Sequence, residues 1–256
     1  LLPTNPPPLD GDSGQVYELA GQRFRVETVA TGLEVPWSLA FLPDGRLVVT
    51  ERPGRLRILD VSSGMTLMAQ HIQDVAPQLP RSEVGLMGLA VSPDFESDGI
   101  VYVSYTSPSG FGLKNVIERL RLGENGFERV DPTPLIDHLP AGYVHDGLPL
   151  RFGPDGKLYA STGEAAQAQR AQDLDYLGGK FLRFNADGTI PADNPFPGSP
   201  VWSLGHRNPQ GFAFHPTRPD LLLATEHGSS FPIDGTGGED EVNRILPGRN
   251  YGWPMY

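Results

Sequence analysis

Four segments of this sequence share one pattern, and this repetition constrains the fold more than any other feature. Each contains an apolar run, a turn with proline (often Pro-Asp-Gly) and a second run rich in β-branched and aromatic residues; the segments are residues 36–59, 85–106, 147–164 and 208–228. Proline and glycine preset the backbone angles with which a chain reverses. The flanking runs have the composition of strands, so each segment is predicted to form a β-hairpin.

The spacing of these segments favours a β-propeller. The aligned prolines are Pro43, Pro93, Pro154 and Pro216, which lie 50, 61 and 62 residues apart. A period near 50 or above, with about four strands per unit, is typical of propeller blades. A sandwich of unrelated hairpins is the alternative, but it gives no reason for a recurring motif. The 31 glycines and 26 prolines in 256 residues also leave little room for long helices.

The ends of the chain carry separate expectations. At ~60 residues per unit the chain holds about four blades, at the lower end of the usual range. The sequence stops after the loop NYGWPMY, so we expect residues 15–256 to form a propeller domain that is incomplete at its C-terminus. Residues 1–14 begin LLPTNPPPLD, without Met or a signal pattern, and indicate a Pro-rich extended tether after a processed start.

Composition argues against several classes of function. The net charge of −11 disfavours a nucleic-acid partner, because neutralising phosphates needs a basic surface. The absence of cysteine excludes disulfides, zinc–thiolate sites and cysteine nucleophiles. No run of 18 or more apolar residues predicts a membrane span. Phosphate-binding glycine loops, zinc-binding helices and serine-hydrolase elbows are also missing from the sequence.

One hairpin carries two candidate catalytic residues. His145 lies in the irregular loop before the third repeat, and Glu164 ends the outgoing strand of the same hairpin. A histidine there suits general-base catalysis because it titrates near neutral pH, although a surface histidine without function fits equally well. The hairpin returns Glu164 toward His145, where a carboxylate would fix the imidazole tautomer.

Corresponding loops before the other repeats supply further candidates. Glu83 precedes the second repeat, and Arg207 and Asn208 precede the fourth. Such loops of successive blades converge at one end of a propeller, where an arginine binds carboxylates or carbonyls. A solvated carboxylate and an Asn-Pro turn are the simpler interpretations. The acidic loop at residues 239–241 has ligand types that suit calcium, but it lacks the EF-hand spacing and also fits a hydrophilic loop.

Several longer runs of the sequence resemble one family. The runs are VPWSLAFLPDGRLVVTER, GLMGLAVSPDF, HDGLPLRFGPDGKLYASTGE, GHRNPQGFAFHP and GGEDEVNRILPGRNYGWP, from about residue 24 to the end. They resemble the soluble quinoprotein sugar dehydrogenases, the glucose/sorbosone and aldose sugar dehydrogenase family. This resemblance implies a six-bladed propeller that holds pyrroloquinoline quinone (PQQ) and calcium at its loop-rich end. It further implies oxidation of an aldose to a lactone, and a periplasmic or secreted location.

The resemblance also implies roles for individual residues. His145 matches the family's base and Glu164 its acidic partner. Residues that match quinone or calcium contacts are Arg207 and Asn208 for the quinone, Glu241 and the Tyr251 carbonyl for calcium, and Gly228 and Ser229 for the calcium that holds the quinone. Glu83 stands in the quinone pocket where well-studied members carry glutamine. Two alternatives remain: a calcium-dependent propeller hydrolase of the lactonase type, and a propeller that only binds other proteins. The electron acceptor and the oligomeric state are not indicated.

Overall fold

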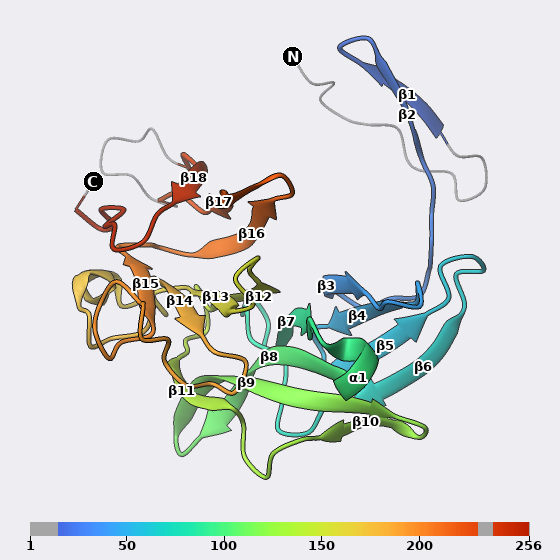
Figure 1. Cartoon of the computed structure of the whole chain (residues 1–256), viewed down its shortest axis with the longest axis horizontal. Helices are drawn as coiled ribbons and strands as arrows, with labels where there is room; N and C mark the ends of the chain where they lie inside the picture. The colour runs from blue at the N-terminus through green and yellow to red at the C-terminus, as the bar shows by residue number, and fades with distance from the viewer. Residues whose placement is uncertain (1–14, 230–237, 256) are drawn as a thin grey trace.

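The structure is a computed structural model, and it describes residues 15–229 and 238–255. The tether predicted at residues 1–14 therefore lies outside the described residues. Nearly all regular structure is β, and four antiparallel sheets follow one another along the chain as the blades of a propeller, arranged in an arc (Figure 1). The predicted all-β propeller is confirmed, and the ring of six blades stays a prediction.

Blades 1 and 2 come first along the chain. Blade 1 has the strands β3 (Pro36–Phe41), β4 (Leu47–Glu51), β5 (Arg55–Leu59) and β6 (Thr66–His71). Blade 2 has β7 (Leu86–Val91), the short helix α1 (Phe95–Asp98), β8 (Ile100–Ser109), β9 (Gly112–Gly123), β10 (Gly126–Arg129) and β11 (Ile136–Pro140). Both β10 and β11 pair with β9, because this long strand offers its two ends to different partners. Blade 2 thus has one strand more than predicted.

Blades 3 and 4 complete the arc. Blade 3 has β12 (Gly147–Phe152), β13 (Leu158–Thr162), the 3₁₀ helix η1 (Ala168–Gln172), β14 (Lys180–Phe184) and β15 (Val201–Leu204). Blade 4 has β16 (Pro209–His215), β17 (Arg218–Glu226) and β18 (Glu241–Ile245). Blades 1 and 3 thus have the predicted four strands, and blade 4 has three among the described residues.

The predicted turns reverse the chain between the first two strands of a blade. In blade 1, Gly45 adopts a φ of +86° and its N–H donates to the carbonyl oxygen of Leu42 (3.0 Å). Asp44 Oδ1 accepts from the N–H of Arg46 (3.0 Å), which closes the turn from the other side. Because glycine enters the left-handed region without a steric cost, the Pro-Asp-Gly sequence fixes the position of the turn.

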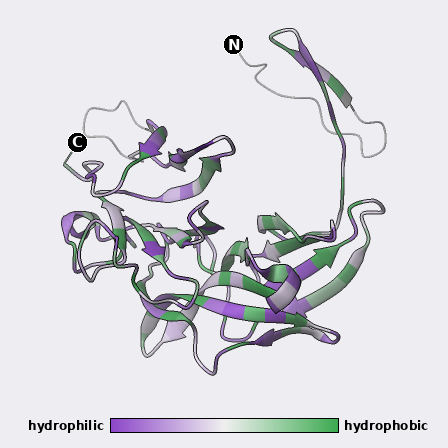
Figure 2. Ribbon diagram, viewed as in Figure 1, coloured by the Kyte–Doolittle hydropathy of each residue, from purple (hydrophilic) through white to green (hydrophobic). Residues whose placement is uncertain are grey.

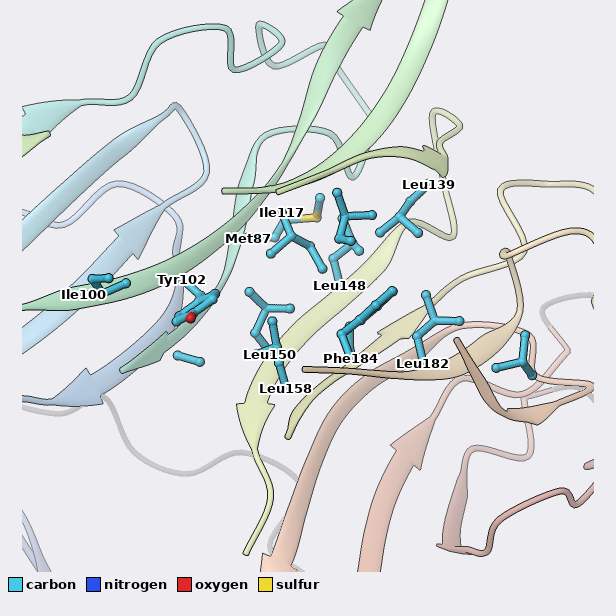
Figure 3. Close-up of a cluster of buried hydrophobic side chains, with 14 of the residues drawn as sticks. Met87, Ile100, Tyr102, Ile117, Leu139, Leu148, Leu150, Leu158, Leu182 and Phe184 are labelled. Atoms are coloured by element: carbon cyan, nitrogen blue, oxygen red, sulfur yellow. The ribbon is translucent and has the colours of Figure 1, made fainter. Parts of the chain in front are cut away.

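Hydrophobic cores lie between consecutive blades. Figure 3 shows the largest, in which β7, β8 and β9 of blade 2 meet β12, β13 and β14 of blade 3; its members include Met87, Ile117, Leu148, Leu150, Leu182 and Phe184. Similar clusters join blade 1 to blade 2 and blade 3 to blade 4. Hydrophobic and hydrophilic residues are interleaved along the strands of each blade (Figure 2). Burial against neighbouring blades is therefore what orders each sheet.

A recurring hydrogen bond also joins the blades. In three blades a hydroxyl of the second strand donates to a carbonyl oxygen on the first strand of the next blade: Thr50 to Met87 (2.6 Å), Ser104 to Leu148 (2.6 Å) and Ser161 to Pro209 (3.2 Å). We call these contacts hydroxyl bridges. In blade 4 the matching hydroxyl, on Thr225, is exposed and donates within its own blade to Gly211 O (3.4 Å). The bridges set the register of one blade against the next.

The first described strands stand apart from the blades. Strands β1 (Gln15–Leu19) and β2 (Gln22–Val26) pair only with each other, and an extended segment connects them to β3 (Figure 1). Every residue of β2 is exposed. This hairpin lies within the range predicted as propeller, but it belongs to none of the four blades.

Candidate active site

Three loops meet at one end of the blades. The first strands of the blades, β3, β7, β12 and β16, lie beside one another, so the loops that enter these strands share one rim. Glu83 Oε2 accepts from the backbone N–H of His145 (2.9 Å) and from Asn208 Nδ2 (3.3 Å). The structure therefore brings together three of the residues that the sequence singled out, each from a different blade.

His145 and Glu164 are in contact, as the hairpin geometry predicts. Nδ1 of His145 lies 2.5 Å from Oε1 of Glu164. The side chain of Glu164 is 2% exposed and that of His145 is 19% exposed. An ionised carboxylate only accepts hydrogen bonds, so Nδ1 carries the hydrogen and Nε2 is the basic nitrogen of the neutral ring. In the described part of the chain Nε2 has no hydrogen-bond partner, so it is available to a bound molecule.

The backbone around this pair adopts conformations that are costly for ordinary residues. His145 has a φ of +60°, and Ala165 and Ala166 have φ values of +54° and +59°. Non-glycine residues held there cost of order 1–3 kcal/mol each and cluster at functional sites. Gly163 allows the two segments to approach, because a Cβ at this position would overlap the carbonyl oxygen of His145 and lie 2.7 Å from Asn208 Oδ1. The chain thus accepts strain in order to place the imidazole.

Arg207 lies on the same rim. It is buried, and its guanidinium lies 5.4 Å from the centre of the Trp253 ring. The carbonyl of Arg207 accepts from the N–H of Glu164 (2.9 Å), which ties its loop to the His145 pair. The indole N–H of Trp253 is buried and has no partner among the described residues. A guanidinium and an unused donor side by side suit an anionic or carbonyl-bearing ligand.

A second histidine–glutamate pair lies directly behind Arg207. His206 Nδ1 is 2.9 Å from Glu226 Oε2, and His206 Nε2 is 2.9 Å from Ser203 Oγ. His206 is fully buried, and its ring stacks on Tyr251 with 4.5 Å between centres. Glu226 Oε1 also accepts from the N–H of Arg207 (2.5 Å). Because both ring nitrogens are engaged, this pair has no atom to offer a substrate.

The predicted calcium ligands are spread over blade 4. Glu241 is exposed, and its Oε2 accepts from Asn243 Nδ2 (2.7 Å). The Gly228 N–H donates to Asp240 Oδ1 (3.0 Å), and the Ser229 carbonyl accepts from the N–H of Gly238 (2.8 Å). The ring of Tyr251 stacks on His206, and its carbonyl remains a predicted ligand. Within residues 15–229 and 238–255, no three His, Cys, Asp or Glu side chains form a cluster with the geometry of a metal site.

The sequence did not indicate a role for Asp146. Its side chain is fully buried beside His145, and burial raises the pKa of this carboxyl to about 7, with a further increase from Glu83. Hydrogen bonds from the N–H of Gly142 and from Asn115 act in the opposite direction. The signal was an acid directly after the candidate base, but Asp-Gly is also frequent in turns.

The chain resembles several known proteins. A family model described as "Glucose / Sorbosone dehydrogenase" matches residues 33–256. The PQQ-bound aldose sugar dehydrogenase of Streptomyces coelicolor is 39% identical, with a TM-score of 0.81, and the match covers 95% of this chain and 67% of that one. Aldose sugar dehydrogenase YliI of Escherichia coli is 34% identical over 90% of this chain. Quinoprotein glucose dehydrogenase B of Acinetobacter calcoaceticus is 30% identical over 94%.

The chain spans only part of the length of the curated relatives that it matches. It spans 62% of the length of the Escherichia coli protein and 54% of that of the Acinetobacter protein. The matched part includes the rim with its three loops. In the described residues, no helix is long and apolar enough to cross a membrane.

Proposed function

Since this chain belongs to the glucose/sorbosone dehydrogenase family, we propose that it oxidises the anomeric hydroxyl of aldose sugars to lactones, with PQQ and calcium as cofactors. One observation carries this proposal: His145 combines a ring with a free Nε2, a buried carboxylate on Nδ1 and a position on the rim that Arg207 shares. A base, its orienting acid and an anion-binding residue are the groups that such an oxidation needs.

The residues around Arg207 fit a quinone with several carboxylates. Arg207 and Asn208 are the proposed contacts of the quinone, and the unpartnered indole N–H of Trp253 adds a donor beside them. Glu83 is less suited to bind an anion directly, and its Oε2 already accepts hydrogen bonds from the His145 loop and from Asn208. When bound, PQQ supplies the two-electron acceptor, and calcium supplies the positive charge that polarises it.

Calcium ligation is proposed for oxygen atoms of blade 4. Glu241, the carbonyls of Gly228 and Ser229, and the carbonyl of Tyr251 are the candidates, and all are oxygen donors of the kind that calcium takes. Glu241 is exposed on β18 and can turn toward an ion. The free-state hydrogen bonds of Glu241 and Ser229 would then exchange for ligation, so calcium should change the surroundings of both residues.

The protein's own contribution to the reaction is to bind, orient and deprotonate the sugar. His145 Nε2 accepts the proton of the anomeric hydroxyl, while Glu164 holds Nδ1–H and stabilises the imidazolium that forms. The hydrogen on the anomeric carbon leaves with two electrons, and the carbon becomes the carbonyl of the lactone. With PQQ bound, this hydride would pass to the quinone while His145 holds the proton, so that both hydrogens lost by the sugar are accounted for.

The test uses the full-length apoprotein with PQQ, calcium and a panel of aldoses. We expect reduction of an artificial dye only when both additions are present, and loss of this activity on removal of calcium with a chelator. Lactone hydrolysis without dye reduction would support the hydrolase instead. If neither activity appears while PQQ fails to bind, the proposal is wrong and a propeller that binds proteins becomes the better explanation. Fractionation of the source cells tests the proposed periplasmic or secreted location.

A further inference from the structure

Asp146 is a buried acid next to the proposed base, and the proposed reaction does not involve it. Its side chain is fully buried, whereas the neighbouring imidazole reaches the surface of the rim. Oδ2 of Asp146 has no hydrogen-bond partner among the described residues. A buried carboxyl with one unsatisfied oxygen is expensive to keep, so its contacts deserve a functional explanation.

The contacts of Asp146 close the loop that carries His145. Oδ1 of Asp146 accepts from the backbone N–H of Gly142 (2.8 Å), four residues earlier. Asn115 on β9 donates from Nδ2 to the same Oδ1 (3.2 Å) and to the carbonyl oxygen of Pro140 (2.9 Å). Residues 140–147 are therefore fastened at both ends to one side chain of blade 2.

Glu83, in the loop before β7, also binds the backbone of the loop that carries His145. Its Oε2 accepts from the backbone N–H of His145 (2.9 Å) and of Asp146 (3.3 Å), and its own N–H donates to the carbonyl oxygen of Tyr143 (2.8 Å). Two carboxyl groups thus bind the backbone of one short loop. Between them they maintain the left-handed conformation of His145, which a free loop would leave.

We propose that Asp146 is a positioning residue for His145: through Gly142 and Asn115 it fixes the loop that aims the imidazole at the substrate, and its charge adjusts the imidazole electrostatically. This proposal rests on the proposed role of His145 as the base. Asp146 touches no reacting atom, so it acts only through its neighbour. Misplacement of a catalytic group by about 1 Å costs as much as 10²-fold in rate, which is the size of effect that such a clamp controls.

The charge of Asp146 is set by its surroundings. Glu83 faces it from the loop before β7, His145 from its own loop and Asn115 from β9. Tyr176, in the segment after β13, also interacts with its charge. Burial is the largest effect and raises the pKa of Asp146 to about 7. Below this pH the carboxyl is neutral. Above it, a second negative charge lies beside the imidazole and stabilises its protonated form.

The experiment compares three substitutions in the full-length protein. Asp146→Asn removes the ionisable group and keeps an acceptor at Oδ1 for the N–H of Gly142 and for Asn115. Asp146→Ala removes the clamp. Asp137→Asn is the matched control, because it removes an exposed carboxylate from β11, whose ion pair with Lys114 is long (3.6 Å).

Two measurements follow from the proposal. With PQQ and calcium, D146A lowers kcat by about 10- to 100-fold while the KM for the sugar changes much less. D146N loses one ionisation in the pH profile of kcat, and D137N behaves as wild type. In the apoprotein, the NMR chemical shifts of the His145 ring are followed against pH. They should show an extra step near pH 7 in wild type and D137N, and this step should be missing in D146N.

The outcomes separate this proposal from the proposed function. If the His145 signals of wild type and D146N follow the same curve, the electrostatic role of Asp146 is wrong. Wild-type kcat in a folded D146A protein shows that the clamp does not position the base. If D146A does not fold, D146N still tests the electrostatic role, because it keeps the hydrogen bond from Gly142 and removes only the charge. A wild-type protein that oxidises no aldose contradicts the proposed function, while the NMR titration of the apoprotein continues to test Asp146.

Discussion

The described part of the chain contains two histidine–glutamate pairs with nearly the same contacts. The histidine is partly exposed in one pair and fully buried in the other. In both, Nδ1 of the histidine faces a buried glutamate oxygen, at 2.5 Å for His145–Glu164 and 2.9 Å for His206–Glu226. Nε2 of His145 is unpartnered in the described residues, whereas Nε2 of His206 accepts from Ser203. The free nitrogen, and not the pair itself, therefore distinguishes the proposed base from a structural support.

The largest expected difference comes from removing each histidine in turn. His145→Ala is expected to lower kcat by about 10²–10⁴-fold, the usual contribution of a general base. Its stability should change little, because the ring is partly exposed. The measurement is dye reduction beside PQQ binding, with the exposed His138→Ala as the control. A His145→Ala protein that retains wild-type kcat would remove the distinction between the two pairs.

His206→Ala is expected to act on stability. It leaves a cavity among Phe181, Tyr251 and Glu226 and deprives a buried carboxylate of its partner, so the free energy of unfolding should fall by about 2–5 kcal/mol. PQQ affinity should fall as well, because Glu226 also binds the N–H of Arg207. Denaturant unfolding of the apoprotein measures the first effect. A change in kcat as large as that of His145→Ala would contradict the structural role.

Glu164→Gln tests the carboxylate that contacts His145. Gln keeps an acceptor for Nδ1–H but cannot stabilise a charged ring, so kcat is expected to fall by about 10- to 100-fold with KM nearly unchanged. Glu226→Gln, in the buried pair, is the matched control and should affect PQQ affinity more than kcat. Steady-state kinetics of the two variants, measured at several pH values, provides the comparison. Equal kinetic effects would mean that the two carboxylates serve the same purpose.

Lys180 binds the backbone of the segment that joins the two pairs, and its substitution is expected to have the smallest effect on stability. Its Nζ is fully buried and donates to the carbonyls of Ala171 (2.8 Å) and Gly178 (2.9 Å), in the segment between Glu164 and His206. Burial lowers the pKa of Lys180 to about 8. Lys180→Met should lower the free energy of unfolding by about 1–3 kcal/mol at pH 7, because these carbonyls lose their donor.

The pH dependence of this effect has a definite sign. Between about pH 8 and 10.5 the folded protein releases the Lys180 proton while the unfolded chain keeps it, so the wild type becomes more stable relative to Lys180→Met as the pH rises. Urea unfolding of both proteins at pH 7 and 9.5 measures the difference. A difference in the free energy of unfolding that stays the same or narrows between pH 7 and 9.5 would show that the buried amine keeps its proton.

The sequence predicted the parts of the site that follow from the repeat. Four similar hairpins imply equivalent loops, and equivalent loops of successive blades meet at one rim; this placed Glu83, His145 and Arg207 near one another. The contact of His145 with Glu164 followed from the return of one hairpin. These predictions succeeded because they used only strand pairing and chain reversal.

The remaining features depend on backbone details that a residue pattern does not carry. His145, Gly147 and Leu148 all have positive φ, so side chains there do not alternate as in a strand, and the inward direction of Asp146 could not be read from its position. The structural role of His206 was not predicted, because its partner Glu226 lies 20 residues later, at the end of β17. Strand β11 was missed because its sequence, IDHLP, has a weak strand pattern.

Because of the hydroxyl bridges, the local unfolding of one blade breaks a hydrogen bond to the next blade. Among the described residues, blades 2 and 3 have a bridge on both sides, while blades 1 and 4 have one on a single side. A linear array of units coupled only to adjacent units opens from its weakly coupled members inward. Among the four described blades, amide hydrogens of β8 and β13 should therefore exchange more slowly with solvent than those of β4 and β17. The loop of the proposed base lies between β8 and β13 in the sequence, so the two more strongly coupled blades also hold His145 in position.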